Sequence, residues 1–400
     1  MKKINLLAML VLVLAFGFTA CDENTVEPEV NEEEENEGIV VVTDNITENT
    51  TWSKDKVYQL GGRIVVEAGA ELTIEAGTII KGEAGSQANA TALIVARDGK
   101  LFAQGTADEP IIFTSVADEI QPGEIASPNL DPTQNGLWGG VIILGNAPIS
   151  ASAAEVQIEG IPTSDPNGLY GGTNAEDNSG EIRYISIRHG GTNIGAGNEI
   201  NGLTLGGVGS GTVIENVEIV GNQDDGIEWF GGTVNVTNAL VWNAGDDGMD
   251  TDQSWSGTMD NFLVVTPAGH CFELDGPEGD VLLDVQHVFS NGTVVASSFD
   301  SDGEVERGSQ DLINTDNNSG VILRNVFITG IADGQIINRV NAANVTFDNV
   351  ILDVNTELTN YIPEGSEVPA GIVAGTSGQA DASVFANWTW ADVAANVSSL

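Results

Sequence analysis

The chain has 400 residues, with 59 Asp and Glu against 13 Lys and Arg, and a formal net charge of −46 at pH 7. A surface this acidic repels polyanions, which disfavours nucleic acid and anionic lipid surfaces as partners. Hydrophobic residues make up 41% of the chain and charged residues 18%, a balance that predicts a folded protein rather than a disordered one.

Residues 1–20 have the pattern of an export signal. Lys2 and Lys3 precede an apolar stretch at residues 6–18, which is too short to span a bilayer. The sequence Phe18-Thr19-Ala20-Cys21 resembles a bacterial lipobox, and the resemblance implies cleavage before Cys21 and attachment of a lipid such as palmitate. An ordinary cleaved signal followed by an incidental cysteine is the alternative.

Residues 21–50 are expected to form a flexible acidic tether. Nine acids lie between Asp22 and Glu37, with too little apolar surface to support a fold. An acidic run directly after a lipidated cysteine resembles the surface-export signal of Bacteroidota lipoproteins. The resemblance implies an outer-membrane lipid anchor and exposure at the cell surface, and a plain spacer is the alternative. No later segment of the sequence is predicted to span a membrane.

Residues 51–380 contain short apolar strands separated by Gly, Asn and Asp. Asn201-Gly202, Asp225-Gly226, Asp247-Gly248 and His270-Cys271 share one phase and follow each other at intervals of 22–24 residues, and Asn291-Gly292 and Asp333-Gly334 are assigned to the same series. A strand on either side of a turn that recurs at this period indicates a solenoid. We predict an all-β, single-stranded, right-handed parallel β-helix with coils of about 22 residues. The segment 300–318 is interpreted as an inserted loop, and residues 381–400 as a C-terminal cap on the last coil.

Four segments, at residues 69–78, 99–106, 110–115 and 138–142, look like the opening coils of secreted β-helix proteins. The body from about Trp52 to Trp390 resembles a family of Bacteroidota β-helix lipoproteins. Some relatives in that family carry the label multidrug transporter, which does not fit a chain without predicted transmembrane segments.

Aligning the coils predicts two columns of polar residues. Asp225, Asp247 and His270 form one column, and Glu228, Asp250 and Glu273 form the other. Neighbouring rungs lie about 4.8 Å apart, so the stacked carboxylates repel each other unless a cation, a shared proton or open solvent compensates.

The first interpretation of these columns is structural. Asn and Asp favour turns because their side chains bond to the local backbone, and Gly follows them readily. The coils at Asn201 and Asn291 lack the acidic cluster, so the turn does not depend on it. In this interpretation the protein is a structural surface spacer.

The second interpretation is a calcium site. Ca²⁺ prefers hard oxygen ligands, and the acids at 224, 225, 246, 247 and 250 resemble the calcium cluster of some β-helical pectate lyases. The proposed ligands are Asp224, Asp225, Asp246, Asp247 and Asp250. Those lyases also use a basic residue, often Lys, a coil or two later. The last lysine here is Lys100, so lyase activity is not expected.

The third interpretation is glycoside hydrolysis. Asn222-Gln223-Asp224, Asp246-Asp247 and Gly269-His270 resemble the order of motifs in polygalacturonases. The resemblance implies that Asp224, Asp246 and Asp247 supply the acid and bases of an inverting reaction, assisted by His270. Cys271 replaces the final Gly of the motif, and no Arg-x-Lys follows, which leaves little to hold a uronate.

Four residues in or near the columns are candidate ligand contacts: Glu228, Trp229, Trp255 and Glu273. Aromatic side chains on an outer face would stack on sugar rings, and packing beneath loops is the alternative. Zinc is not expected, because the chain has only three histidines, scattered along the sequence. Arg188 and His189 are interpreted as a structural pair, and His287 as a solvent-facing strand residue.

The hypothesis that these patterns favour is a lipid-anchored surface protein that binds a polysaccharide or a protein partner with the help of Ca²⁺. A polygalacturonase-like hydrolase and a structural spacer are the alternatives.

Overall fold

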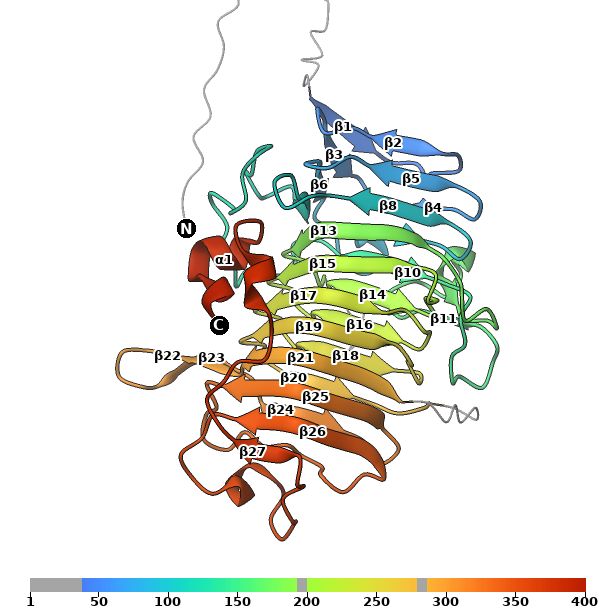
Figure 1. Cartoon of the computed structure of the whole chain (residues 1–400). Helices are drawn as coiled ribbons and strands as arrows, with labels where there is room; N and C mark the ends of the chain where they lie inside the picture. The colour runs from blue at the N-terminus through green and yellow to red at the C-terminus, as the bar shows by residue number, and fades with distance from the viewer. Residues whose placement is uncertain (1–37, 193–199, 279–285) are drawn as a thin grey trace, which may run out of the picture. The chain divides into compact units, whose positions relative to one another are not determined.

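The computed structural model describes residues 38–192, 200–278 and 286–400, and residues 38–400 form one compact unit (Figure 1). The predicted signal, the lipobox with Cys21 and most of the predicted tether lie outside the described residues. The tether was expected to reach residue 50, but the first strand already begins at Ile39. Its sequence, Ile-Val-Val-Val, is β-branched throughout, which favours an extended strand.

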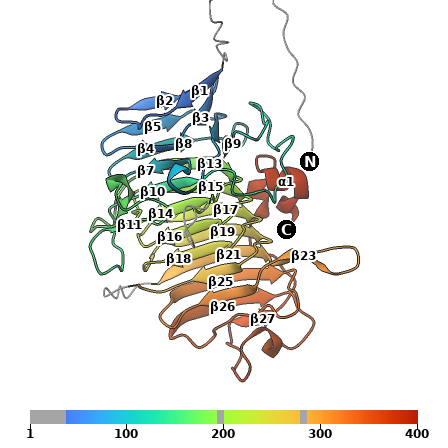
Figure 2. The same ribbon diagram turned by 180° about the vertical axis from the view of Figure 1, so that it is seen from behind.

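The core of the fold is two long sheets of parallel strands, and Figures 1 and 2 show the strands stacked in coils from β1 to β27. The larger sheet, sheet A, contains β1 (Ile39–Val42), β2 (Thr50–Trp52), β3 (Val57–Leu60), β5 (Glu71–Ile74), β6 (Ile79–Gly82), β8 (Lys100–Gln104), β9 (Ile111–Ser115), β13 (Gly180–Arg188), β15 (Val213–Val220), β17 (Val236–Trp242), β19 (Thr258–Val265), β21 (His287–Val295), β25 (Gly320–Thr329), β26 (Asn344–Leu352) and β27 (Ile372–Ala374). Sheet B contains β4 (Arg63–Val66), β7 (Ala92–Val95), β10 (Val141–Leu144), β14 (Leu203–Gly206), β16 (Ile227–Phe230), β18 (Met249–Asp252), β20 (His270–Leu274) and β24 (Asp311–Thr315).

The remaining elements are short. Two antiparallel hairpins pair β11 (Val156–Gln157) with β12 (Leu169–Tyr170), and β22 (Ser297–Phe299) with β23 (Val305–Gly308). The helical elements are η1 (Gln87–Asn89), η2 (Pro166–Gly168), η3 (Leu358–Tyr361), η4 (Ala382–Phe385), α1 (Trp390–Ala395) and η5 (Val397–Ser399). Among the described residues, none of the helices has the length and apolar character needed to cross a membrane.

The strand pairing confirms the predicted parallel β-helix. In sheet B, Leu203 pairs with Ile227, Ile227 with Met249, and Met249 with Phe272. Each step along the sheet therefore corresponds to one coil of the chain. These four side chains point inward and are fully buried, so the apolar positions of successive coils stack into one continuous core.

An asparagine ladder, which the sequence analysis did not identify, bends the strands of sheet A. Its members have positive φ angles and lie at the same place in successive strands: Asn216, Asn238, Asn261, Asn291, Asn325 and Asn349. The amide of Asn238 donates to Asn216 over 2.9 Å, and that of Asn261 donates to Asn238 over 2.7 Å. Asn tolerates the left-handed conformation because its short side chain can bond locally. Asn291 therefore belongs to this ladder and not to the turn series to which it was assigned.

Two further expectations about the later coils were wrong. The segment 300–318 is not simply an inserted loop, because it contains β24, which forms a full rung of sheet B next to β20. The column at His270 continues with Asp311 rather than with Asn291 or Asp333. The β22–β23 hairpin accounts for much of the extra chain between His270 and Asp311.

The C-terminal segment, defined as residues 379–400, does not cover the last coil as predicted. It lies along the outer face of sheet A, beside the middle coils (Figures 1 and 2). Its backbone N–H groups bond to β21 at Thr293, then to β19 at Asn261, and finally to β15 at Glu218. Apolar side chains from β15, β17 and β19 pack against it, namely Val220, Leu240, Trp242, Leu263 and Val265 against Phe385, Trp388 and Trp390. The segment packs on the outward-facing apolar side chains of these strands rather than on the open end of the solenoid, because this contact removes apolar surface from water.

Candidate functional site

The outward-facing column of sheet B changes from apolar to acidic along the solenoid. In register, it contains Val65, Ile94, Ile142, Thr204, Glu228, Asp250, Glu273 and Asn314. The first three pack beneath residues 149–170, in a cluster with Ile149, Ile158 and Tyr170. The acidic members follow directly after this covered part, and residues 149–170 still contact Phe230 of β16.

A first group of carboxylates joins both predicted columns. Asp225, Glu228 and Asp250 each place a carboxylate oxygen within 4.8 Å of the others. Asp225 is 7% exposed and Glu228 is 6% exposed. Burial raises the pKa of each of the three well above its ordinary value, and the charges of neighbouring carboxylates raise it further. The group therefore favours either bound protons or a cation that neutralises it.

Asn201 borders this first group. It occupies the coil before Asp225, it is 1% exposed, and its amide nitrogen donates a hydrogen bond to Glu228. Its amide oxygen is buried and has no hydrogen-bond partner among the described residues. A buried amide oxygen without a donor is costly, and a metal ion would satisfy it. Rotation of the amide by 180° exchanges its two atoms and turns the oxygen toward Glu228.

The first group fits a calcium ion. Two oxygens that each lie about 2.4 Å from one Ca²⁺ are at most about 4.8 Å apart, and one carboxylate oxygen from each of the three residues lies within that distance of the others. All the available donors are oxygens, which Ca²⁺ prefers. Asp225, Glu228 and Asp250, with the oxygen of Asn201, would hold such an ion, and water would complete its shell.

A second group is more exposed and shares Asp225. It contains Asp224, Asp225 and Asp246, with their closest carboxylate oxygens within 4.8 Å of one another. Asp224 is half-buried and Asp246 is exposed. The structure therefore brings four of the five predicted calcium ligands into two overlapping groups. The fifth, Asp247, belongs to neither.

The turn column has a structural role that the first interpretation anticipated. A carboxylate oxygen of Asp225 accepts the backbone N–H of Asp247 over 2.9 Å. In the same way, Asp247 accepts the backbone N–H of His270. Each aspartate thus ties its own turn to the next coil, which accounts for these two positions without any ligand.

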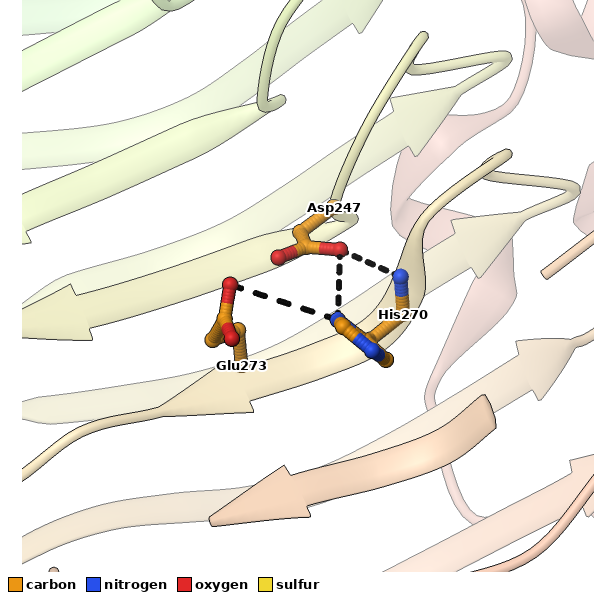
Figure 3. Close-up of side chains that lie close together, drawn as sticks. All are labelled: Asp247, His270 and Glu273. Carbon is orange, nitrogen blue, oxygen red and sulfur yellow. Dashed lines mark hydrogen bonds and ion pairs between the residues drawn. The ribbon is translucent and has the colours of Figure 1, made fainter. Parts of the chain in front are cut away.

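A third group forms around the imidazole of His270 (Figure 3). Its Nδ1 lies 3.0 Å from Oδ1 of Asp247 and 4.0 Å from Oε2 of Glu273. Burial alone would lower the pKa of His270, but the contact with Asp247 raises it, and the net direction is upward. Burial, followed by the interaction with Asp247, raises the pKa of Glu273 to about 8. The sequence analysis placed Asp247 and His270 in one column and in the hydrolase alternative, and Glu273 among the ligand contacts, and the structure brings all three together.

Two more carboxylates extend the acidic face. Asp252 is the last residue of β18, and Asp275 bonds through its backbone N–H to Thr251 of the same strand. Burial is the main cause that raises the pKa of Asp252 to about 7 and that of Asp275 to about 6. The carboxyl groups of Asp252 and Asp275 therefore remain partly protonated near neutral pH.

The aromatic side chains proposed to stack on sugars are in the wrong place for that role. Trp229 is fully buried and Trp255 is 1% exposed, and their rings stack on each other with centroids 4.6 Å apart. In β16, Trp229 lies two positions after Ile227 and therefore points to the same inner side of the sheet. This alternation can be read from the sequence. His287 is also buried, against the ring of Trp255, and does not face solvent. The acids Glu228 and Glu273 point outward as expected.

Residues 44–368 match a family described as a pectate-lyase like beta helix domain. This match confirms the β-helical, pectate-lyase-like resemblance inferred from the sequence. No curated protein and no solved structure matches the chain. The lipoprotein resemblance and the surface location remain predictions.

Proposed function

Because this chain belongs to the family of pectate-lyase-like β-helix domains, we propose that it is a cell-surface protein that binds glycan in a calcium-dependent manner. The binding face is the acidic part of sheet B from Glu228 to Glu273, around the first group. The observation that carries the proposal is the buried set of Asp225, Glu228 and Asp250 beside the amide oxygen of Asn201, which has no hydrogen-bond partner among the described residues. Bound Ca²⁺ would supply positive charge to this face.

The charge of the face narrows the class of glycan. With no cation bound, the face offers no positive charge to a polyuronate, whether its carboxyl groups are protonated or ionised. A bound divalent cation would instead coordinate the carboxylates of an acidic polysaccharide directly. We therefore expect binding to acidic glycans that is lost on chelation, and little binding to neutral ones.

The calcium site is tested by thermal unfolding of the chelator-treated protein with and without CaCl₂. A ligand that binds only the folded state stabilises it by about 2.7 kcal/mol at 100 times its Kd, so Tm should rise and saturate. Asp250→Asn should abolish the rise while the fold is retained. Asp302→Asn removes one charge from an exposed loop position and serves as the matched control. A Tm that does not respond to Ca²⁺ in the unmodified protein contradicts the site.

Glycan binding is tested separately on immobilised acidic and neutral polysaccharides. We expect retention on the acidic material with Ca²⁺, release by EGTA, and no retention of Asp250→Asn. Binding that persists in EGTA would show that the cation is not required and would contradict the proposed mode of binding.

The lipid anchor and the surface location are part of the proposal and are supported by the sequence pattern that ends at Cys21. Metabolic labelling with an alkyne analogue of palmitate should label the unmodified protein, and Cys21→Ala should remove the label. Protease added to intact cells should digest a surface-exposed protein. Protection of the protein from that protease would contradict the outward orientation.

Hydrolysis remains the second candidate. Asp224 and Asp246, two of the predicted catalytic residues, share one group with Asp225. Asp247 and His270 form a pair, but they belong to a different group. This division of the predicted catalytic residues between two groups favours binding over an inverting reaction. Reducing-end release that is abolished by Asp247→Asn would reverse the ranking.

A further inference from the structure

In the third group, the position of Nδ1 of His270 is not explained by hydrogen bonding. Nδ1 of His270 is buried, and no described atom forms a hydrogen bond with it. It nevertheless faces two carboxylates, 3.0 Å from Asp247 and 4.0 Å from Glu273, as Figure 3 shows. The contact with Asp247 is short but poorly aligned for a hydrogen bond. An imidazole nitrogen and two carboxylate oxygens that converge in this way are the donors of a metal site.

The spacing of these donors suits a small divalent cation. Zn–N and Zn–O bonds are about 2.0–2.2 Å long, so two ligands of a tetrahedral ion lie about 3.4 Å apart. The distances from Nδ1 of His270 to the oxygens of Asp247 and Glu273 are 3.0 and 4.0 Å, one below and one above that value. Adjustments of about half an ångström in side-chain position would bring both to it.

Polar contacts behind the donors hold them in place. The amide of Asn314 donates to Oε1 of Glu273 over 2.7 Å, which leaves Oε2 directed toward His270. Asn338 in turn donates to Asn314. On the other side, Asp247 accepts the backbone N–H of His270. Such outer contacts orient metal ligands and are typical of metal sites.

We propose that Asp247, His270 and Glu273 form a three-ligand site for a borderline divalent cation, with Zn²⁺ as the probe. Neutral His270 and two carboxylates give the ligand set a charge of −2, which the metal neutralises. The side chains of His270 and Glu273 are 20% and 31% exposed, so water can reach a fourth position. The nitrogen donor separates this site from the all-oxygen calcium group one coil away, and the proposal is independent of the calcium site.

The test is a titration of the full chain with Zn²⁺ in competition with a chromophoric chelator, with Ca²⁺ present at saturation. We expect one equivalent to bind to the unmodified protein. His270→Gln and Glu273→Gln should each weaken binding at least 100-fold, and Asn314→Ala should weaken it 10–100-fold. Asp302→Asn should bind like the unmodified protein. The response of Tm to Ca²⁺ should survive in His270→Gln, which separates this site from the calcium group.

A spectroscopic measurement does not depend on the variants folding. X-ray absorption of the zinc-loaded unmodified protein should show one nitrogen donor at about 2.0–2.1 Å together with oxygen donors. Unchanged Zn²⁺ affinity in a folded His270→Gln variant, or an all-oxygen shell, would overturn the proposal. Failure to bind one equivalent of Zn²⁺ would also overturn the proposal, because His270 and the two carboxylates would then be only a charged cluster beside a structural turn.

Discussion

A buried ion pair beneath the C-terminal segment gives the sharpest stability prediction. Arg188 and Glu218 both have fully buried side chains, and their charged groups lie 3.6 Å apart. Nε of Arg188 donates to Ser186 over 2.7 Å, and Ser186 donates to Glu218 over 2.5 Å. Glu218 also accepts the backbone N–H of Ala391 over 2.9 Å, and the guanidinium lies 5.1 Å from the ring of Trp390.

The perturbation is Glu218→Gln, which keeps the shape and an acceptor for Ala391 but removes the negative charge. Arg188 then remains in a fully buried position and loses its ion-pair partner. Breaking a buried pair in this way costs about 3–5 kcal/mol. The matched control is Glu215→Gln, because Glu215 pairs with Arg183 on the same strands while 38% of its side chain is exposed. An exposed pair contributes about 0–1 kcal/mol, so the two variants should differ by at least about 2 kcal/mol.

The assay is equilibrium unfolding in urea followed by tryptophan fluorescence, together with limited proteolysis of the C-terminal segment. Glu218→Gln should unfold at a lower urea concentration and release the segment more readily. The double variant Arg188→Met/Glu218→Leu removes both charges and should recover most of the loss. If Glu218→Gln costs no more than Glu215→Gln, the buried pair does not hold the segment and the reasoning fails.

Three other predictions concern the acidic face and the core. Burial raises the pKa of Asp252 to about 7 and that of Asp275 to about 6. Between about pH 4 and 7 the folded state therefore binds more protons than the unfolded state, so the stability of the metal-free protein should decrease as the pH rises. A calorimetric Tm that increases with pH over this range would contradict this sign. Trp229→Ala should cost about 3–5 kcal/mol of unfolding free energy in urea, and a cost near zero would mean that the ring is not in the core. Burial raises the pKa of Cys271 to about 12, so mass spectrometry should find its peptide unalkylated by iodoacetamide until the protein unfolds; rapid labelling of the folded protein would contradict the burial.

The sequence was sufficient for the fold class and for the register of the central coils. The phase shared by Asn201, Asp225, Asp247 and His270 matches the pairing of sheet B, because each coil there repeats with little variation in length. The repeat of 22–24 residues no longer predicts the register after His270, because the β22–β23 hairpin lengthens that coil. Asn291-Gly292 looked like another turn because a left-handed Asn suits both a turn and the bend inside a strand.

The candidate site was predicted in part, for a similar reason. Column alignment found its carboxylates, but it could not show that Asp247 turns to His270 and Glu273 while Asp225 turns to Glu228. These pairings depend on side-chain direction and on the amides of Asn201 and Asn314, which period and composition do not encode. The position of the C-terminal segment was missed because Trp388 and Trp390 signal burial without indicating against which coil.

The attachment of the C-terminal segment to β15, β17 and β19 changes how the solenoid carries mechanical load. In a simple solenoid, each coil contacts only its neighbours, so a pull on the C-terminus peels off the last coil first. Here residues 379–400 pass the force to strands in the middle of the stack. The coils from β25 to β27 lie outside that path and stay unloaded until the contacts of this segment with β15, β19 and β21 have all broken.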